Sequence, residues 1–228
     1  ELDMLETGYP RWGEDCVWEE DQGVAIVFKI AQGTPDEQQA QAPETLQDNA
    51  PILLNREGSD TWRECDGTRT IDEITSLLMK KYKANPDTLK ENVMSFVKDF
   101  ANMGLLVLRR NKEKSDRRIY SGKEKIRLAR NVSWNNENGE ITILNNETGE
   151  LMLIGRRPDW TLMWRLLDGK RTLQEILADI SAPKVSETER GRITIEPLNL
   201  IPSTALLVLR LRALEKMGLI EIGDKNVE

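Results

Sequence analysis

The sequence predicts an α+β protein made of two similar halves, each a three-stranded antiparallel sheet followed by three helices. Three observations lead to this fold class. One stretch of the chain occurs twice, strand-like apolar runs precede helix-like runs in both halves, and helix start and stop signals fall at matching places. Strands and helices that follow one another in separate runs are typical of α+β domains.

The repeated stretch begins at Trp62 and occurs again, without a gap, 102 residues later at Trp164. Both copies fit W-R-x-x-D-G-x-R-T-x-x-E-I, which indicates a tandem duplication. Asp-Gly predicts a helix end, because Gly adopts the left-handed conformation without steric cost. Thr70 and Thr172 are each followed three residues later by Glu, the spacing of a capping box. The stretch therefore predicts a helix, a tight turn and a capped helix, a helix-turn-helix corner whose residues are structural rather than catalytic.

The first half shows strand signals before helix signals. After an irregular lead-in over residues 1–13, β-branched and apolar runs predict strands at 16–18, 24–30 and 51–55. Residues 33–50 have no periodicity and are interpreted as a mobile loop. Apolar residues at helical spacing then predict helices at about 58–65, 71–81 and 86–103, before a strand at 105–108.

The second half follows the same plan. Strands are expected at 132–134, 140–144 and 150–154, helices at about 160–167, 173–180 and 203–217, and a closing strand at 220–222. Residues 181–200 form an insertion relative to the first half. It contains Ile193–Ile195, which fits an extra strand, and one hypothesis is that this strand pairs with the sheet edge of the second half and blocks it.

Charge is spread unevenly over three segments, which we take as domain boundaries: a first repeat at 1–108, a connector at 109–130 and a second repeat at 131–228. Their net charges are −11, +7 and −3, which sum to the −7 of the chain. The basic connector is interpreted as a solvated linker, with contact to an acidic partner or to nucleic acid as the alternative.

Composition excludes several kinds of site. The chain has no histidine, so histidine-based acid–base or triad chemistry is absent. Its two cysteines form no C-x-x-C motif and cannot hold a metal or a three-cysteine cluster alone, so we expect no cofactor and no enzyme activity. No apolar run reaches the ~20 residues that span a membrane. With no secretory signal visible, these features favour a cytoplasmic protein.

Three short motifs resemble the PqqD family: Leu54-Asn55, the W-x-x-x-D-G of Trp62 to Gly67, and the Gly-Leu-Leu that begins at Gly104. That family contributes the RiPP recognition element, a small winged helix-turn-helix-like module. The resemblance covers most of both halves and implies two tandem copies. The second half departs from it by its insertion and by having Gly155 at the position of Asn55.

The resemblance implies a peptide-binding chaperone. Such modules bind the leader of a ribosomally made precursor peptide and present it to a modifying enzyme, often a radical SAM protein. The leader adds as a strand to the sheet edge and lies against the third helix. The implied contacts in the first repeat are Ile52, Leu53, Leu54, Val93, Met94, Val97 and Lys98. Those in the second are Leu151, Met152, Leu153, Ile154, Leu207, Val208, Leu211 and Arg212.

The last helix of the second half carries apolar residues on more than one side, among them Leu206, Val208 and Leu209. A helix that is apolar nearly all round is buried on two sides. One interpretation is that its second side packs on the first repeat or on the insertion. The other is that it lines a groove for a ligand or partner.

Two other functions compete with peptide capture. A winged-helix DNA-binding regulator would explain the corner and the basic connector, but the acidic first repeat disfavours it, so we expect no nucleic acid partner. A scaffold subunit that holds enzymes without binding a peptide would use the same surfaces, and the sequence does not separate it from peptide presentation.

Overall fold

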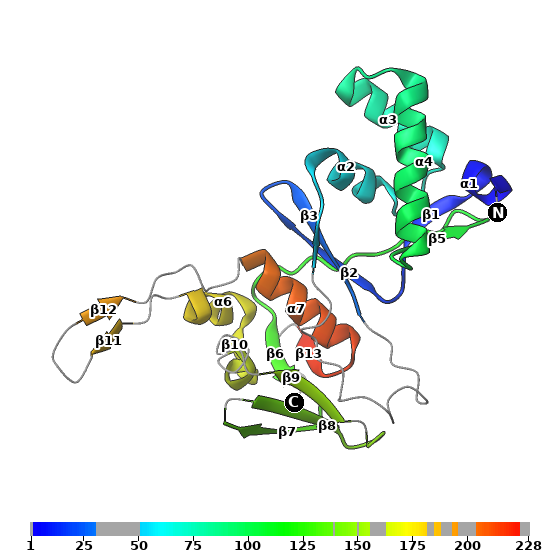
Figure 1. Cartoon of the computed structure of the whole chain (residues 1–228). Coiled ribbons are helices and arrows are strands. Elements are labelled where there is room, and N and C mark those ends of the chain that lie inside the picture. Colours follow the sequence, from blue (N-terminus) through cyan, green and yellow to red (C-terminus); the bar gives the residue numbers. More distant parts are fainter. Residues whose placement is uncertain are drawn as a thin grey trace. The chain divides into compact units, whose positions relative to one another are not determined.

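The structure is a computed structural model, and it describes residues 2–30, 51–138, 140–149, 151–155, 163–181, 185–187, 193–195 and 204–223. The chain forms two compact units (Figure 1). Among the described residues, unit 1 comprises 2–30 and 51–118, and unit 2 comprises those from 119 onward. Both combine antiparallel sheets with helices, which confirms the α+β class. The predicted loop at 33–50 lies outside the described residues.

Unit 1 begins with a short helix and two small sheets. Strands β2 (Cys16–Asp21), β3 (Val24–Lys29) and β4 (Ile52–Leu53) form an antiparallel sheet in that order. The β2–β3 turn has Gln22 and Gly23 at φ of 50° and 84°. Two successive positive φ values are typical of a tight two-residue hairpin. Helices α2 (Arg56–Glu64), α3 (Ile71–Tyr82) and α4 (Pro86–Asn102) follow, and α4 packs on α3 (Figure 1).

The sequence predicted an irregular lead-in over residues 1–13, but the structure has regular elements there. It contains helix α1 (Leu2–Thr7) and strand β1 (Tyr9–Trp12), which pairs antiparallel with β5 (Leu106–Arg109). The indole of Trp12 donates to the carbonyl oxygen of Trp62 at 2.9 Å and stacks near its ring. Trp62 is fully buried among Trp12, Trp18 and Phe100, so the lead-in supplies part of the core.

Side chains cap the helices of unit 1. The Thr70 hydroxyl accepts from the Glu73 N–H while the Glu73 carboxylate accepts from the Thr70 N–H, which confirms the predicted capping box. The side chain of Asn85 accepts from the first N–H groups of α4. Such caps satisfy donors that a helix start leaves without an intrahelical acceptor.

The connector is fastened to unit 1 over its first part. The N–H of Glu113 donates to the Gly67 carbonyl at 3.0 Å, and the N–H of Ser115 donates to the Asp66 carbonyl at 2.6 Å. Glu113 also forms an ion pair with Arg11 at 2.9 Å. This part of the connector is therefore a bonded segment of unit 1 and differs from the expected solvated linker.

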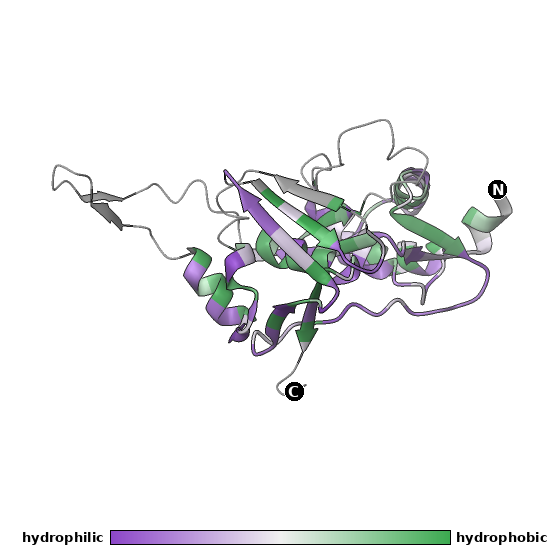
Figure 2. Ribbon diagram, turned by 90° about the horizontal axis from the view of Figure 1, so that it is seen from below, coloured by the Kyte–Doolittle hydropathy of each residue, from purple (hydrophilic) through white to green (hydrophobic). Residues whose placement is uncertain are grey.

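Unit 2 contains three antiparallel sheets. The first has the order β7 (Val132–Glu137), β8 (Glu140–Asn145), β9 (Leu151–Gly155). The second has the order β10 (Asp168–Thr172), β6 (Lys125–Leu128), β13 (Ile220–Gly223). The third pairs β11 (Val185–Glu187) with β12 (Ile193–Ile195). Its described helices include α6 (Leu173–Ser181) and α7 (Thr204–Lys216). Figure 2 shows hydrophobic and hydrophilic residues together on single helices, as amphipathic packing requires.

The second half starts earlier than residue 131. Strand β6 lies inside the predicted connector, and its Ile126 is fully buried in the core of unit 2. It pairs with the last strand of unit 2, β13, as β1 pairs with β5 in unit 1. Both units therefore show the order strand, three-stranded sheet, Asp-Gly turn, helices and closing strand. The duplication of the whole module stays a prediction that this shared order supports.

Two expectations for unit 2 have different outcomes. The insertion does contain a strand at Ile193–Ile195, but its hydrogen-bonded partner is β11, so the hypothesis that it blocks the edge of the β7–β8–β9 sheet is wrong. Helix α7 is buried on more than one side, as its composition predicted: Leu207 and Leu211 belong to the core of unit 2, and Leu209 is buried outside that cluster.

Within the described part of the chain, no helix has the length and apolar character needed to cross a bilayer. The same residues contain no group of three potential metal-ligating side chains of the His, Cys, Asp and Glu types. Both cysteines, Cys16 and Cys65, are free thiols buried in unit 1. Burial, followed by the charges of Asp66 and Glu64, raises the pKa of the Cys65 thiol, which keeps it protonated.

Candidate functional site

Strand β4 is the edge of its sheet. Ile52 pairs with Val27 and Leu53 with Ile26, and no other described strand pairs with β4. The N–H of Leu54 donates to the Ala25 carbonyl of β3 at 3.0 Å. Successive residues of a strand point their N–H and C=O groups to opposite sides. The N–H and C=O of Leu53 therefore point away from β3, toward the open side of the sheet.

Side chains of this edge alternate between the core and solvent. Leu54 is 7% exposed and belongs to the core of unit 1, and Ile52 is half-buried against that core. Leu53, between them, is 67% exposed. Within the part of the chain that the structure describes, the edge thus offers a free backbone donor and acceptor together with an exposed leucine, features that a chain adding as a further strand would use.

Asn55 fixes where the edge strand ends and α2 begins. Its backbone is extended, and its side-chain oxygen accepts from the N–H of Gly58 at 2.7 Å. This N-cap explains the Leu-Asn motif: the leucine enters the core while the asparagine starts the helix.

Helix α4 reaches this region through Phe96. A Cβ atom at Gly58 would lie 3.4 Å from a ring carbon of Phe96 and 3.7 Å from the Cβ of Leu54, so both side chains lie against that glycine. Phe96 is half-buried and stacks on Phe100, with 4.3 Å between ring centroids. Phe96 was not among the residues implied for the site. The signal for it is Gly58, a small residue at the start of α2 that leaves room for a large side chain.

The other residues predicted on α4 divide into two groups. Val93 and Val97 are 2% and 0% exposed and lie in the core, so they support the helix from beneath and present no surface. Met94 is half-buried against that core, and Lys98 is exposed. Only Met94 and Lys98 of the predicted α4 set are therefore accessible to a partner.

This region has a counterpart among known families. Residues 42–106 match the PqqD family, described as coenzyme PQQ synthesis protein D. The match contains β4, all of α2, α3 and α4, and the Asp-Gly turn. No curated protein matches the chain. Among solved structures, the chain is similar to one described as TbiB1 in complex with the TbiA(beta) leader peptide, with 17% identity over 42% of this chain and 93% of that one, and a TM-score of 0.33.

The PqqD match lies in the first half, and the site predicted in the second half differs in the structure. Strand β9 is again an edge strand, and Leu151 on it is 55% exposed opposite Leu144. Leu207 and Leu211, however, are core residues, and Arg212 is buried with its guanidinium 4.4 Å from the ring centroid of Tyr120. Val208 is half-buried, and the side chains of Met152, Leu153 and Ile154 lie outside the described residues.

A polar cluster centred on Asp60 of α2 holds α2 and α3 in place next to β4. The Asp60 carboxylate accepts from Arg63 at 2.6 Å and from Lys81 at 2.5 Å, and it also accepts from the Tyr82 hydroxyl. Arg63 in turn donates to the Gly23 carbonyl at 2.7 Å. Asp60 therefore links α2 to the end of α3 and, through Arg63, to the β2–β3 turn.

The electrostatics of α4 do not resemble a DNA-reading helix. Such helices carry basic side chains for phosphates and amide or arginine side chains for base edges. The exposed charges of α4 include three acids and two bases: Asp87, Glu91, Asp99, Lys90 and Lys98. A helix with this balance of charge does not suit a polyanion.

Proposed function

We propose that this chain is a non-catalytic peptide-binding chaperone that captures an extended segment by adding it as a strand to β4, beside α4. The segment would be the leader of a ribosomally made precursor peptide, presented to a separate modifying enzyme of the radical SAM type. The observation that carries the proposal is the open edge at Leu53 inside the PqqD match. The two cysteines of the sequence support a separate enzyme, since a radical SAM cluster needs three.

The energetics of such capture come from two sources. The free N–H and C=O of Leu53 would each form a backbone hydrogen bond worth about 1 kcal/mol net. Alternate side chains of the guest would then cover Leu53 on one face and approach Ile52 on the other, burying apolar surface at ~25 cal/mol per Å². Backbone bonds tolerate many guest sequences, so side-chain contacts with Leu53, Ile52, Met94 and Lys98 would set specificity.

Substituting Leu53→Pro should weaken peptide binding about 30-fold, or about 2 kcal/mol, because it removes the outward N–H and leaves its guest acceptor without a partner. Proline is tolerated in an edge strand where the N–H faces away from the sheet, so the fold should persist. The probe would be a peptide selected on the full-length chain from a random displayed library, with its affinity measured by isothermal titration calorimetry.

Two control variants distinguish the contribution of the Leu53 N–H to the affinity from that of its side chain. Leu53→Ala keeps the N–H and should lose only about fivefold, or about 1 kcal/mol, through the missing apolar contact. Leu77→Ala removes an exposed leucine from α3 and should leave the affinity unchanged. Equal affinities for the wild type and Leu53→Pro would contradict strand addition at β4. Failure to select any peptide would favour the scaffold function instead.

Unit 2 offers a second candidate edge at β9, with Leu151 exposed on it. We assign the primary site to unit 1, because it combines the free Leu53 edge with the family match and with accessible residues on α4. The titration above also gives the stoichiometry. This assignment predicts one peptide per chain, bound about 30-fold more weakly by Leu53→Pro.

A further inference from the structure

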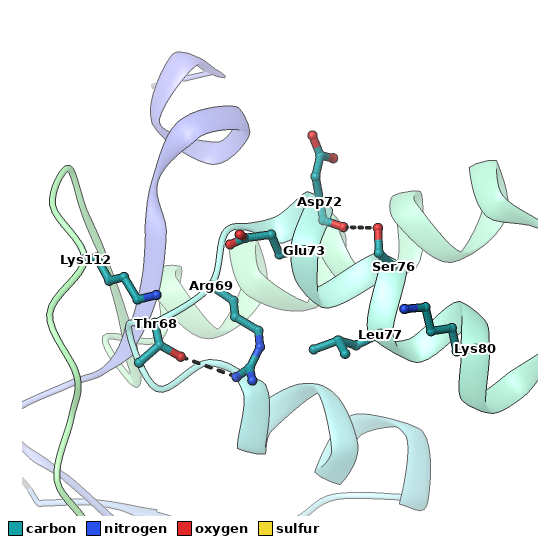
Figure 3. A pocket seen from close by; sticks show the side chains of 8 residues that line it. All are labelled: Thr68, Arg69, Asp72, Glu73, Ser76, Leu77, Lys80 and Lys112. Atoms are coloured by element: carbon teal, nitrogen blue, oxygen red, sulfur yellow. Dashed lines mark hydrogen bonds between the residues drawn. The ribbon is translucent and has the colours of Figure 1, made fainter.

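A second surface of unit 1 is hollowed on the outer side of α3. The hollow has a volume of about 460 Å³ and is shown in Figure 3. Its lining comes from three segments: the turn after Asp-Gly, helix α3 and the connector. The residues are Thr68, Arg69, Asp72, Glu73, Ser76, Leu77, Lys80 and Lys112.

Backbone contacts hold the connector wall against the turn. Lys112 lies next to Glu113 in the chain. The N–H of Glu113 donates to the Gly67 carbonyl at 3.0 Å, and its carboxylate pairs with Arg11 at 2.9 Å. The turn itself is fixed by Asp66, whose carboxylate accepts from the Thr68 N–H at 3.0 Å. The hollow therefore has walls fixed by hydrogen bonds of the protein itself, and it exists before a partner binds.

The charges around the hollow are partly neutralised within the protein. Arg69 pairs with Glu64 at 2.9 Å, and Asp72 pairs with Lys90 at 2.8 Å. The Glu73 carboxylate caps α3. Lys80 and Lys112 are exposed and form no ion pair within the described part of the chain. Two cations are thus left for a partner, on a unit that is otherwise acidic.

An apolar side chain lies between these cations. Figure 3 shows Lys112 and Lys80 on opposite sides of the view, with Arg69 and Leu77 between them. Leu77 is 38% exposed, on a helix whose other side, including Ile74 and Leu78, is buried in the core. Between the two lysines the lining therefore offers the apolar side chain of Leu77, beside Arg69, whose charge is already balanced by Glu64.

We propose that this hollow docks a partner protein through a short segment in which two carboxylates flank an apolar side chain. The carboxylates would pair with Lys80 and Lys112, and the apolar side chain would cover Leu77. A phosphate group fits less well, because it concentrates its charge at one point while the two lysines lie on opposite sides of the hollow (Figure 3), and because it offers no apolar group to Leu77. In an extended segment every second side chain points the same way, so Glu-Ala-Leu-Ala-Glu is the simplest sequence that turns both carboxylates and the leucine toward the hollow.

Nuclear magnetic resonance titration of the full-length chain tests the docking site. The probe is acetyl-Glu-Ala-Leu-Ala-Glu-amide, and acetyl-Gln-Ala-Leu-Ala-Gln-amide is its uncharged match. We expect saturable shifts of the Ser76 and Leu77 amides with the acidic peptide and none with the glutamine peptide. Lys80→Glu and Lys112→Glu should each weaken binding about five- to tenfold, since each replaces a surface attraction by a repulsion.

Lys114→Glu is the matched control, because it makes the same charge change on an exposed connector residue that does not line the hollow. It should leave the affinity unchanged. The docking site is overturned if Lys114→Glu weakens binding as much as Lys112→Glu, if the glutamine peptide binds equally well, or if inorganic phosphate produces the same saturable shifts. Leu53→Pro should not alter these shifts, so this test is independent of the proposed strand addition.

Discussion

Replacing Gly67 by alanine should destabilise unit 1 by about 3 kcal/mol. The residue has φ of +84°, which costs a residue with a Cβ roughly 1 kcal/mol. An added Cβ would also lie 2.0 Å from the carbonyl oxygen of Glu113, far inside contact distance. The connector would have to move, and two backbone hydrogen bonds, from Glu113 to Gly67 and from Ser115 to Asp66, would be lost at about 1 kcal/mol each.

The same substitution at Gly23 isolates the cost of backbone strain. Gly23 has the same φ of +84°, and a Cβ there would meet no atom within 4 Å. Gly23→Ala should therefore cost only the backbone strain, about 1 kcal/mol. Urea titration with thiol labelling is a suitable measurement, because both cysteines are buried in unit 1 and report on its unfolding alone. Equal destabilisation at the two positions would contradict the connector contact.

Asp60→Asn should cost about 2 kcal/mol. The Asp60 side chain is 8% exposed and serves two cations and a tyrosine hydroxyl, so neutralising it leaves those groups without their anion. Breaking a fully buried ion pair costs roughly 3–5 kcal/mol. The cost expected here is lower, because Lys81 is 56% exposed and solvent screens its charge. Asp72→Asn, which removes an exposed carboxylate paired with Lys90, should cost less than about 0.5 kcal/mol by the same thiol-labelling assay.

The cost of Asp60→Asn should depend on pH. Burial tends to raise the pKa of Asp60, but hydrogen bonds from Lys81 and Tyr82 and the charges of Lys81 and Arg63 outweigh it, and the net pKa lies below 3.8. A carboxyl whose pKa is lower in the folded state stabilises the fold above its unfolded pKa and loses this effect as the pH falls through the folded value. The difference between wild type and Asp60→Asn should thus be constant from pH 5 to 7 and shrink below about pH 4. A difference that grows on acidification would contradict the assigned network.

Local signals in the sequence were sufficient for the elements that depend on near neighbours. The capping box at Thr70 and the left-handed glycine at Gly67 each involve groups a few residues apart, so the motif already contains what is needed to predict them. Strand β1 was missed because its partner is distant: Tyr9 pairs with Arg109, and four residues with a proline among them carry no strand period of their own. Strand β6 was hidden for the same reason inside a run of basic residues.

The candidate site was predictable in outline only. The edge strand followed from the family resemblance, and Leu53 proved exposed on it. The accessible face of α4 could not be predicted in the same way. The 3.6-residue period shows which residues of α4 are apolar, but it does not show which of them lie beneath the surface. Val93 and Val97 therefore entered the predicted set although they are core residues, and Phe96 was left out. The hollow on α3 could not be seen at all, since its connector wall depends on backbone bonds to Gly67.

The backbone amide of Leu53 provides the most direct test of peptide capture at β4. Hydrogen exchange of this amide, resolved by nuclear magnetic resonance, should be fast in the free chain, because its N–H points away from β3. Exchange should slow by at least about tenfold when the library-selected peptide saturates the chain, because the Leu53 N–H then donates a hydrogen bond to the added strand. An amide that is already protected without peptide, or whose exchange is unchanged at saturation, would contradict strand addition at this edge.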